Sequence, residues 1–173
     1  MKEVEIVFTT SKKKFAPFSK LIMWYTNKPY SHVARKAKLD LLQYHHYYQA
    51  SEGKINYEYE DFFNKKHKIV KSYTIQISNH FYEELIKESW MQVGNKYGTM
   101  QNLGILIVDL LAKIGIKATN PFKKGMNCSE LIYRTVFSKL IPNLPYRPDL
   151  IKPHQIEEII IKHNLATNIT YDK

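Results

Sequence analysis

The chain changes character near residue 79, and this change limits the folds that it can adopt. Before residue 79, short segments rich in β-branched and aromatic residues are separated by brief turns, as in β-strands. After it, apolar residues recur at spacings of three and four, as in helices. The links between the strands are too short for crossover helices, so we expect an antiparallel sheet. Strands followed by helices predict the α+β class, with C-terminal helices packed against an N-terminal sheet.

Turn and capping residues set the boundaries of the expected elements. The expected strands cover residues 4–9, 30–38, 41–50, 55–59 and 69–77, with a turn at 39–40 between the second and third. The expected helices cover residues 17–26, 81–93, 101–114, 128–141 and 153–164. Pro17 and Pro153 suit a first helical turn, and Pro142 ends the helix before it. The length of 173 residues fits one domain, 1–173.

The chain is strongly basic, with a formal net charge of +10. Its lysines are spread along the sequence, which favours an anionic partner such as acidic lipid head groups or an anionic cell-wall polymer. A solvated, lysine-rich surface without a partner is the alternative. We do not expect nucleic acid as the partner, because the sequence has no concentrated arginine-rich stripe.

Two segments bear on location. Residues 1–10, MKEVEIVFTT, lack the apolar core of a signal peptide. The longest apolar stretch, residues 103–116, is interrupted by Asp109 and Lys113. It is shorter than the roughly 20 residues of a membrane span and suits a buried or interfacial helix. We expect a cytoplasmic protein, or one that is phage-encoded and released by lysis.

Cys128 is the single cysteine, so an internal disulfide and a multi-cysteine metal site are excluded. It begins the segment CSELIYRTVFSKLI, which has helical spacing, and Asn127 or Ser129 can cap that helix. Unpaired N–H groups and the positive end of the helix dipole stabilise a thiolate at this place. The alternative is a small buried apolar side chain without chemistry. We expect no metal and no cofactor.

A thiolate nucleophile needs a histidine that serves as base and acid. Among the seven histidines, His32 lies at the start of an expected strand, directly after a turn, where its imidazole can be held rigidly. His45 and His46 point to opposite faces of one strand, so they cannot both bind one metal. His67 and His80 lie at polar edges of elements, and we expect both at the surface.

Several short motifs occur in the order found in one enzyme family. PYSHV comes early and NCSELI late, and SKLIMWYTN, YYQASEG, GNKYG and PHQIEEII lie around them. With these motifs in this order, the chain resembles the circularly permuted branch of the NlpC-like, papain-like cysteine hydrolases. This branch includes YiiX-like proteins and lecithin retinol acyltransferase. In that branch the histidine precedes the cysteine. The similarity extends from about Ser11 to His163 and implies a permuted papain-like fold.

The resemblance implies roles for individual residues. Cys128 would be the nucleophile, His32 the general base and acid, and Gln49 the residue that orients His32. The family often has Glu where this chain has Gln49, so His45, which by period-two counting shares a strand face with Gln49, and Glu52 stay open as alternatives for the third role. Tyr30 or Tyr97 could donate a hydrogen bond to the oxyanion, although packing is the alternative role of each tyrosine.

These roles predict a cysteine hydrolase that transfers an acyl group to water through an acyl-enzyme. The expected substrates are amides or peptides, including peptidoglycan stem peptides. One alternative keeps the fold but acts on lipid acyl groups at a membrane surface, with residues 103–116 and their flanking lysines at the interface. A further alternative is a basic binding module without enzymatic activity, in which Cys128 is buried and unreactive.

Overall fold

The computed structural model describes residues 1–38, 44–98, 100–122 and 124–171. In this part of the chain, six strands form one sheet in the order β4-β3-β2-β1-β5-β6, and all neighbouring strands are antiparallel. The strands are β1 (Lys2–Ser11), β2 (His32–Lys38), β3 (His45–Ser51), β4 (Lys54–Tyr59), β5 (His67–Ile77) and β6 (Ala166–Tyr171). The expected α+β class and antiparallel sheet are confirmed.

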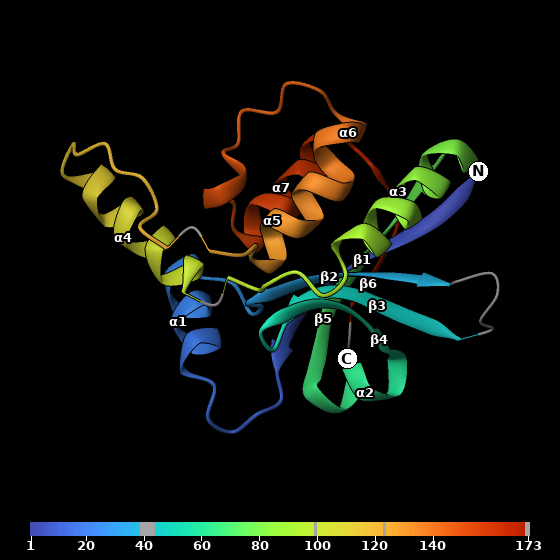
Figure 1. The fold of residues 1–173 in the computed structure, drawn as a ribbon, viewed down its shortest axis with the longest axis horizontal. Helices are drawn as coiled ribbons and strands as arrows, with labels where there is room; N and C mark the ends of the chain where they lie inside the picture. The colour runs from blue at the N-terminus through green and yellow to red at the C-terminus, as the bar shows by residue number, and fades with distance from the viewer. Residues whose placement is uncertain (39–43, 99, 123, 172–173) are drawn as a thin grey trace.

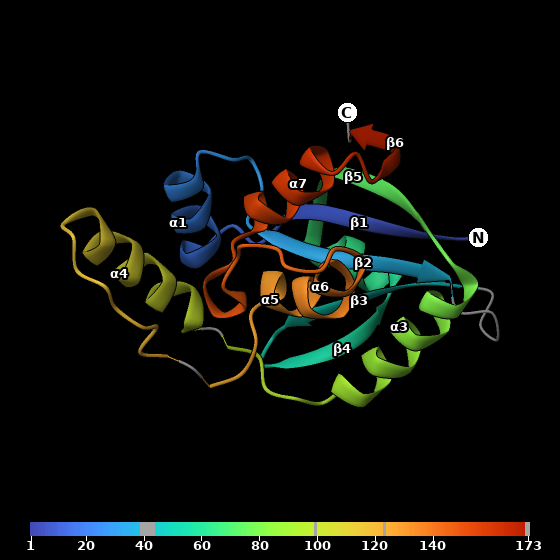
Figure 2. The same ribbon diagram turned by 90° about the horizontal axis from the view of Figure 1, so that it is seen from above.

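The helices fall into three groups around this sheet (Figures 1 and 2). One group packs on one face, α2 packs on the other, and α1 and α4 lie together beyond one end of the strands. The helices are α1 (Pro17–Thr26), α2 (Glu60–Lys66), α3 (Asn79–Gln92), α4 (Gln101–Lys113), α5 (Cys128–Ile132), the π-helical turn η1 (Tyr133–Phe137), α6 (Ser138–Leu140), the 3₁₀ turn η2 (Pro148–Leu150) and α7 (Pro153–Lys162).

Strand β1 contributes buried side chains to both faces of the sheet, because successive side chains of a strand point to opposite faces. Val4, Ile6 and Phe8 are buried in the large core beneath α3, α5 and α7. Val7 points the other way and packs with Phe63 of α2 in a small second core. A central strand buried on both faces holds the residues at its ends in fixed positions.

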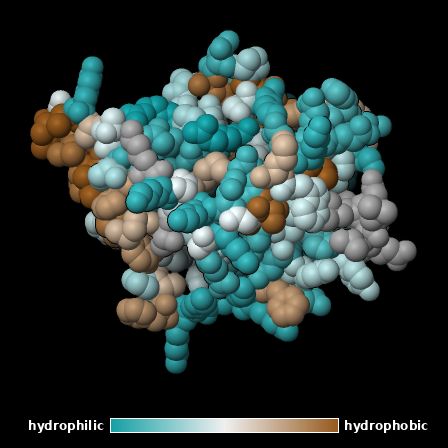
Figure 3. Space-filling model, viewed as in Figure 1, coloured by the Kyte–Doolittle hydropathy of each residue, from teal (hydrophilic) through white to brown (hydrophobic). Residues whose placement is uncertain are grey.

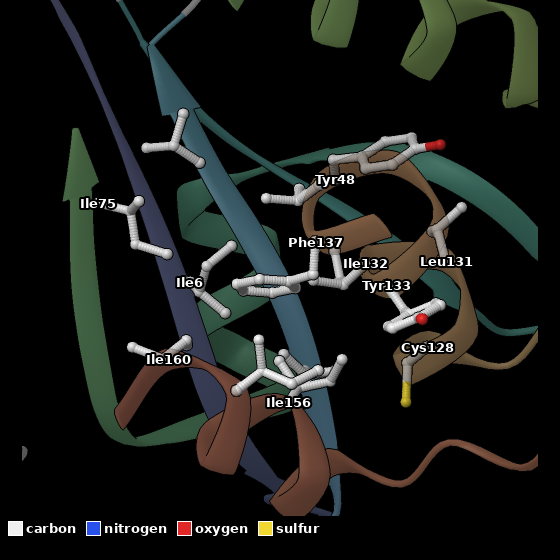
Figure 4. Close-up of a cluster of buried hydrophobic side chains, with 14 of the residues drawn as sticks. Ile6, Tyr48, Ile75, Cys128, Leu131, Ile132, Tyr133, Phe137, Ile156 and Ile160 are labelled. Atoms are coloured by element: carbon white, nitrogen blue, oxygen red, sulfur yellow. The ribbon is translucent and has the colours of Figure 1, made fainter. Parts of the chain in front are cut away.

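Helices α5, η1 and α6 form one continuous helical run over residues 128–140. The Asn127 side chain caps it by accepting a hydrogen bond from the Glu130 N–H at 2.8 Å. Leu131, Ile132 and Phe137 are fully buried against the sheet. Figure 4 shows the Cys128 sulfur at the start of α5, pointing away from the apolar side chains that follow it. The first turn of this run is thereby fixed at the edge of the core.

Three elements were not predicted: helix α2, which lies between the expected strands 55–59 and 69–77, the 3₁₀ turn η2, and β6, which extends the sheet after the last helix. The expected turn at 39–40, and residues 41–43 of an expected strand, lie outside the described residues. The other expected elements are present, and where they are described their ends coincide with the expected ends or differ from them by one or two residues.

Helices α1 and α4 are joined through one carboxylate. The Tyr25 hydroxyl of α1 donates to Asp109 of α4 at 2.6 Å, and Lys152 lies 2.6 Å from the same carboxylate oxygen. Each of the ten residues of α1 keeps part of its surface exposed. In the described portion of the chain, no helix combines the length and apolar character that crossing a membrane requires.

Candidate active site

Cys128 lies where the sequence pattern places it, at the first position of α5. Its side chain is 3% exposed and belongs to the large core. A tight backbone contact fixes the loop before it. Gly125 has a φ of +90°, and a Cβ there would lie 2.5 Å from the Lys96 carbonyl oxygen. Glycine is therefore required for the chain to pass this close to residues 96–98 before α5 begins.

His32 is the first residue of β2 and is 9% exposed. Its Nε2 lies 2.9 Å from Oε1 of Gln49 on β3, which is 1% exposed. Because Nε2 is engaged by Gln49, Nδ1 is the nitrogen left for the Cys128 thiol, and each of these two groups shifts the pKa of the other. Three residues from three separate elements thus meet at one place.

Glu58 of β4 fixes the orientation of the Gln49 amide. Gln49 Nε2 donates to Glu58 Oε2 at 2.7 Å, so Oε1 is the atom that faces His32. His32 Nε2 must therefore donate, which sets the tautomer of the neutral ring. Lys66 Nζ donates to the other oxygen of Glu58 at 2.7 Å. The negatively charged carboxylate of Glu58 therefore reaches His32 only through the neutral Gln49 side chain.

The pKa values of Cys128 and His32 shift in opposite directions. Burial alone would raise the pKa of the Cys128 thiol, but the charge and hydrogen bond of His32 lower it below its ordinary value. Burial alone would lower the pKa of His32, but the Cys128 thiolate, Gln49 and Glu58 raise it above its ordinary value. Both shifts favour a thiolate–imidazolium pair.

The sequence predicts His67 at the surface, but in the structure its ring lies beside that of His32. The two rings stack with centroids 5.0 Å apart and planes inclined by 20°. Phe63 stacks on the far side of His67 at 4.5 Å. Burial first, and the positive charge of His32 second, lower the pKa of His67 to about 3. His67 is therefore a neutral wall that limits the rotation of the His32 ring.

A cleft of about 150 Å³ opens beside this cluster. It is lined by residues from α1, α4, the sheet and the turn before α4: Ser11, Phe18, Ser19, Ile22, Ser31, His32, Ala50, Ser51, Glu52, His67, Tyr97 and Asn102. Cys128 is not part of the lining. His32 and Tyr97 are part of it, and both interact electrostatically with the Cys128 thiol, so these two residues connect the cleft to the cysteine.

Tyr97 stays a candidate for the oxyanion donor, whereas Tyr30 does not. Burial and the neighbouring Cys128 raise the pKa of Tyr97, and its hydroxyl accepts a 3.5 Å hydrogen bond from Asn102, so its own proton is left for another acceptor. The buried Tyr30 hydroxyl instead donates to Glu157 of α7. That interaction holds Tyr30 in a structural role away from the thiol.

The two alternatives for the third residue are wrong. His45 pairs with Lys38 at the far end of β2, six residues from His32, which corresponds to roughly 20 Å along the strand. Glu52 lies in the turn between β3 and β4 and binds Lys66 at 2.7 Å and Lys13 at 3.5 Å. Gln49 alone among the proposed orienting residues contacts the imidazole.

Comparisons with known proteins give no independent guide to the chemistry. No family model matches the chain, and no curated protein matches it. Within the described residues, no group of three or more His, Cys, Asp or Glu side chains is arranged to hold a metal ion.

Proposed function

We propose that the chain is a cysteine hydrolase of the permuted papain-like type, with Cys128 as nucleophile. The observation that carries this proposal is the meeting of Cys128, His32 and Gln49, because a helix-start thiol, an imidazole and an orienting amide are the parts that activate a thiolate. Activation by a neighbouring imidazole and by the start of a helix is the general route to a reactive cysteine.

The proposed reaction transfers an acyl group from an amide or ester to water. The Cys128 thiolate attacks the carbonyl carbon, and the Cys128 N–H and the Tyr97 hydroxyl stabilise the oxyanion. When the intermediate collapses, the carbon–nitrogen or carbon–oxygen bond breaks and His32 protonates the leaving group. His32 then takes a proton from water, and the resulting hydroxide attacks the thioester to release the acid and restore the thiolate.

Gln49 and Glu58 share the third role in this proposal. Gln49 holds His32 by accepting from Nε2 but carries no charge. Glu58 supplies the charge from behind Gln49 and raises the pKa of His32. The pair thereby replaces a single carboxylate beside the imidazole. This division accounts for the Gln in a position where the resembled family often has Glu.

Peptides and other amides, including peptidoglycan stem peptides, are the substrates proposed first. Lipid acyl groups are the second candidate, because α1 and α4 line the cleft and also present apolar side chains to the outside. A cytoplasmic location stays a prediction.

Acyl-enzyme formation tests the proposal directly. The full chain is incubated with p-nitrophenyl acetate and quenched, and the modified peptide is found by mass spectrometry. We expect acetylation at Cys128 in the unaltered chain and its loss in the His32→Ala variant, with the fold checked by circular dichroism. Acetylation only at lysines, at the same rate in Cys128→Ser, would contradict the proposal.

A further inference from the structure

Helices α1 and α4 and the residues next to them carry large apolar side chains that stay partly or largely exposed. Phe15, Phe18, Trp24, Leu110, Ile114 and Ile116 are between 43% and 84% exposed. Figure 3 shows apolar surface over α4 and, further down the same edge, over α1. The Tyr25–Asp109 hydrogen bond ties the two helices together, so these side chains belong to one surface. An apolar surface of this kind marks an interaction site.

The same two segments hold nearly all of the net charge. Residues 12–29 and 95–125 together contain ten lysines, one aspartate, no glutamate and no arginine, a net charge of +9 out of the chain's +10. Lys14, Lys20, Lys113, Lys117 and Lys124 are exposed. The single aspartate, Asp109, is paired with Lys152. Lys13 and Lys28 pair with Glu52 and Glu157 outside the two segments, so apolar side chains and a large excess of positive charge occur on one surface.

We propose that the α1–α4 surface docks on an anionic lipid bilayer, with the helices lying in the interface. Large apolar side chains enter the boundary between head groups and acyl chains, and lysines extend to the lipid phosphates. An exposed tryptophan such as Trp24 is favoured at this depth. Anionic lipid supplies the countercharge that this surface lacks.

Two other occupants fit the surface less well. A second copy of the chain would bring two strongly basic surfaces together, which electrostatic repulsion opposes. Nucleic acid would match the charge, but the exposed side chains include isoleucine and leucine and no arginine lies in either segment. Aliphatic side chains gain from burial in lipid and do not read a phosphate backbone.

Docking would also place the cleft at the bilayer. Phe18, Ser19 and Ile22 of α1 and Asn102 of α4 line the cleft beside His32. The same two helices therefore touch lipid on one side and form the cleft wall on the other. If the proposed hydrolase activity holds, its substrate is an acyl group presented at the membrane surface. This last step rests on the proposed function, whereas docking itself does not.

Tryptophan fluorescence and vesicle co-sedimentation test the docking. Trp90 is the other tryptophan, so Trp90→Phe leaves Trp24 as the single reporter. At low salt, we expect a blue shift of Trp24 emission with vesicles of phosphatidylcholine and phosphatidylglycerol, and little change with phosphatidylcholine alone. A Cys128→Ser variant should bind equally, which separates docking from catalysis.

Substitutions then separate the apolar and charged contributions. Replacing Trp24, Leu110 and Ile114 by serine should weaken co-sedimentation by at least about tenfold. Replacing Lys20, Lys113 and Lys117 by glutamine should weaken it by roughly a hundredfold, because each lysine near an anionic bilayer strengthens binding by about fivefold.

The matched control replaces Met91 and Ile161, which are similarly exposed elsewhere, by serine and should bind as the unaltered chain does. No binding to the anionic vesicles at low salt would overturn the proposal. So would equal weakening by the control variant, saturable binding of a single-stranded oligonucleotide in place of vesicles, or burial of Trp24 through formation of a dimer.

Discussion

The surroundings of Cys128 and the α1–α4 surface are built in opposite ways. Around Cys128, side chains are buried, and His32, Gln49 and Glu58 are each fixed by a specific hydrogen bond. On α1, every residue keeps some exposure, and apolar side chains face outward. This contrast underlies both proposals: that one region holds reacting groups in position, and that the other binds a partner outside the chain.

The largest difference between the regions should appear in activity. His32→Ala removes the base and acid of the proposed mechanism, and we expect the rate of acyl transfer to fall by about 10³-fold or more. His80→Ala is the control, since His80 is exposed and paired only with Glu84 on its own helix. Steady-state rates with an activated ester measure both. Similar rates for the two variants would remove His32 from the mechanism.

The free energy of unfolding should also differ between substitutions near Cys128 and substitutions on the α1–α4 surface. Leu131 is fully buried on α5, so Leu131→Ala should lower the free energy of unfolding by about 2–4 kcal/mol. Leu110 is more than half exposed on α4, so Leu110→Ala should change it by less than about 0.5 kcal/mol. Urea denaturation of both variants provides the comparison. An equal loss would mean that α4 is buried in the free protein.

Glu157 of α7 is another buried side chain that is fixed by hydrogen bonds. Burial would raise its pKa, but hydrogen bonds from Lys71, Tyr30 and Tyr73 lower the pKa of Glu157 to about 2. A lowered carboxyl pKa adds stability that is present above the ordinary pKa of 4.5 and is lost as pH falls toward 2. The shift corresponds to about 3 kcal/mol.

Glu157→Gln should therefore reduce stability at neutral pH and flatten its dependence on pH between about 4.5 and 2. The exposed neighbour Glu158 is the control, and Glu158→Gln should leave both unchanged. Thermal unfolding across this pH range measures the effect. If Glu157→Gln lost stability between pH 4.5 and 2 as steeply as the unaltered chain, the hydrogen bonds to Glu157 would not contribute to stability in acid.

A smaller effect tests the charge behind Gln49. Glu58→Ala leaves Gln49 without its anchor and lowers the pKa of His32, so activity should fall about tenfold and the high-pH limb of the rate profile should move to lower pH. Glu52 binds the same lysine at the same 2.7 Å but does not contact Gln49. Glu52→Ala should leave the limb in place. If both variants shift the limb equally, Glu58 acts through Lys66 rather than through Gln49.

Local patterns predicted most of the fold. Segments rich in β-branched and aromatic residues marked the strands up to residue 77, and prolines marked where helices begin and end. Helix α2 was missed because it has seven residues and buries only Phe63. Strand β6 was missed because it is an edge strand with largely exposed side chains, so its burial does not alternate.

Local patterns also predicted only part of the site. Motif order selected Cys128, His32 and Gln49, but period-two counting gives the face of a residue and not its end of the strand, which is why His45 was wrong. Glu58 could have been found: the turn after residue 51 pairs Gln49 with Asn56, and Glu58 follows on the same face.

His67 and Tyr30 depended on strand order and on a distant helix. His67 comes close to His32 because both flank the end of β1, through pairings that adjacent sequence does not reveal. Tyr30 is held by Glu157, 127 residues later in the chain. Contacts made by non-consecutive strands and by the last helix lie beyond what local periodicity can predict.

The pH dependence of alkylation directly measures whether His32 activates the Cys128 thiol. Rates of iodoacetamide labelling at Cys128 are determined for the folded chain and for His32→Ala. We predict a midpoint below the ordinary thiol pKa of about 8.5 in the unaltered chain, rising toward that value in His32→Ala. The same midpoint at or above about 8.5 in both, or no labelling until the protein unfolds, would contradict it.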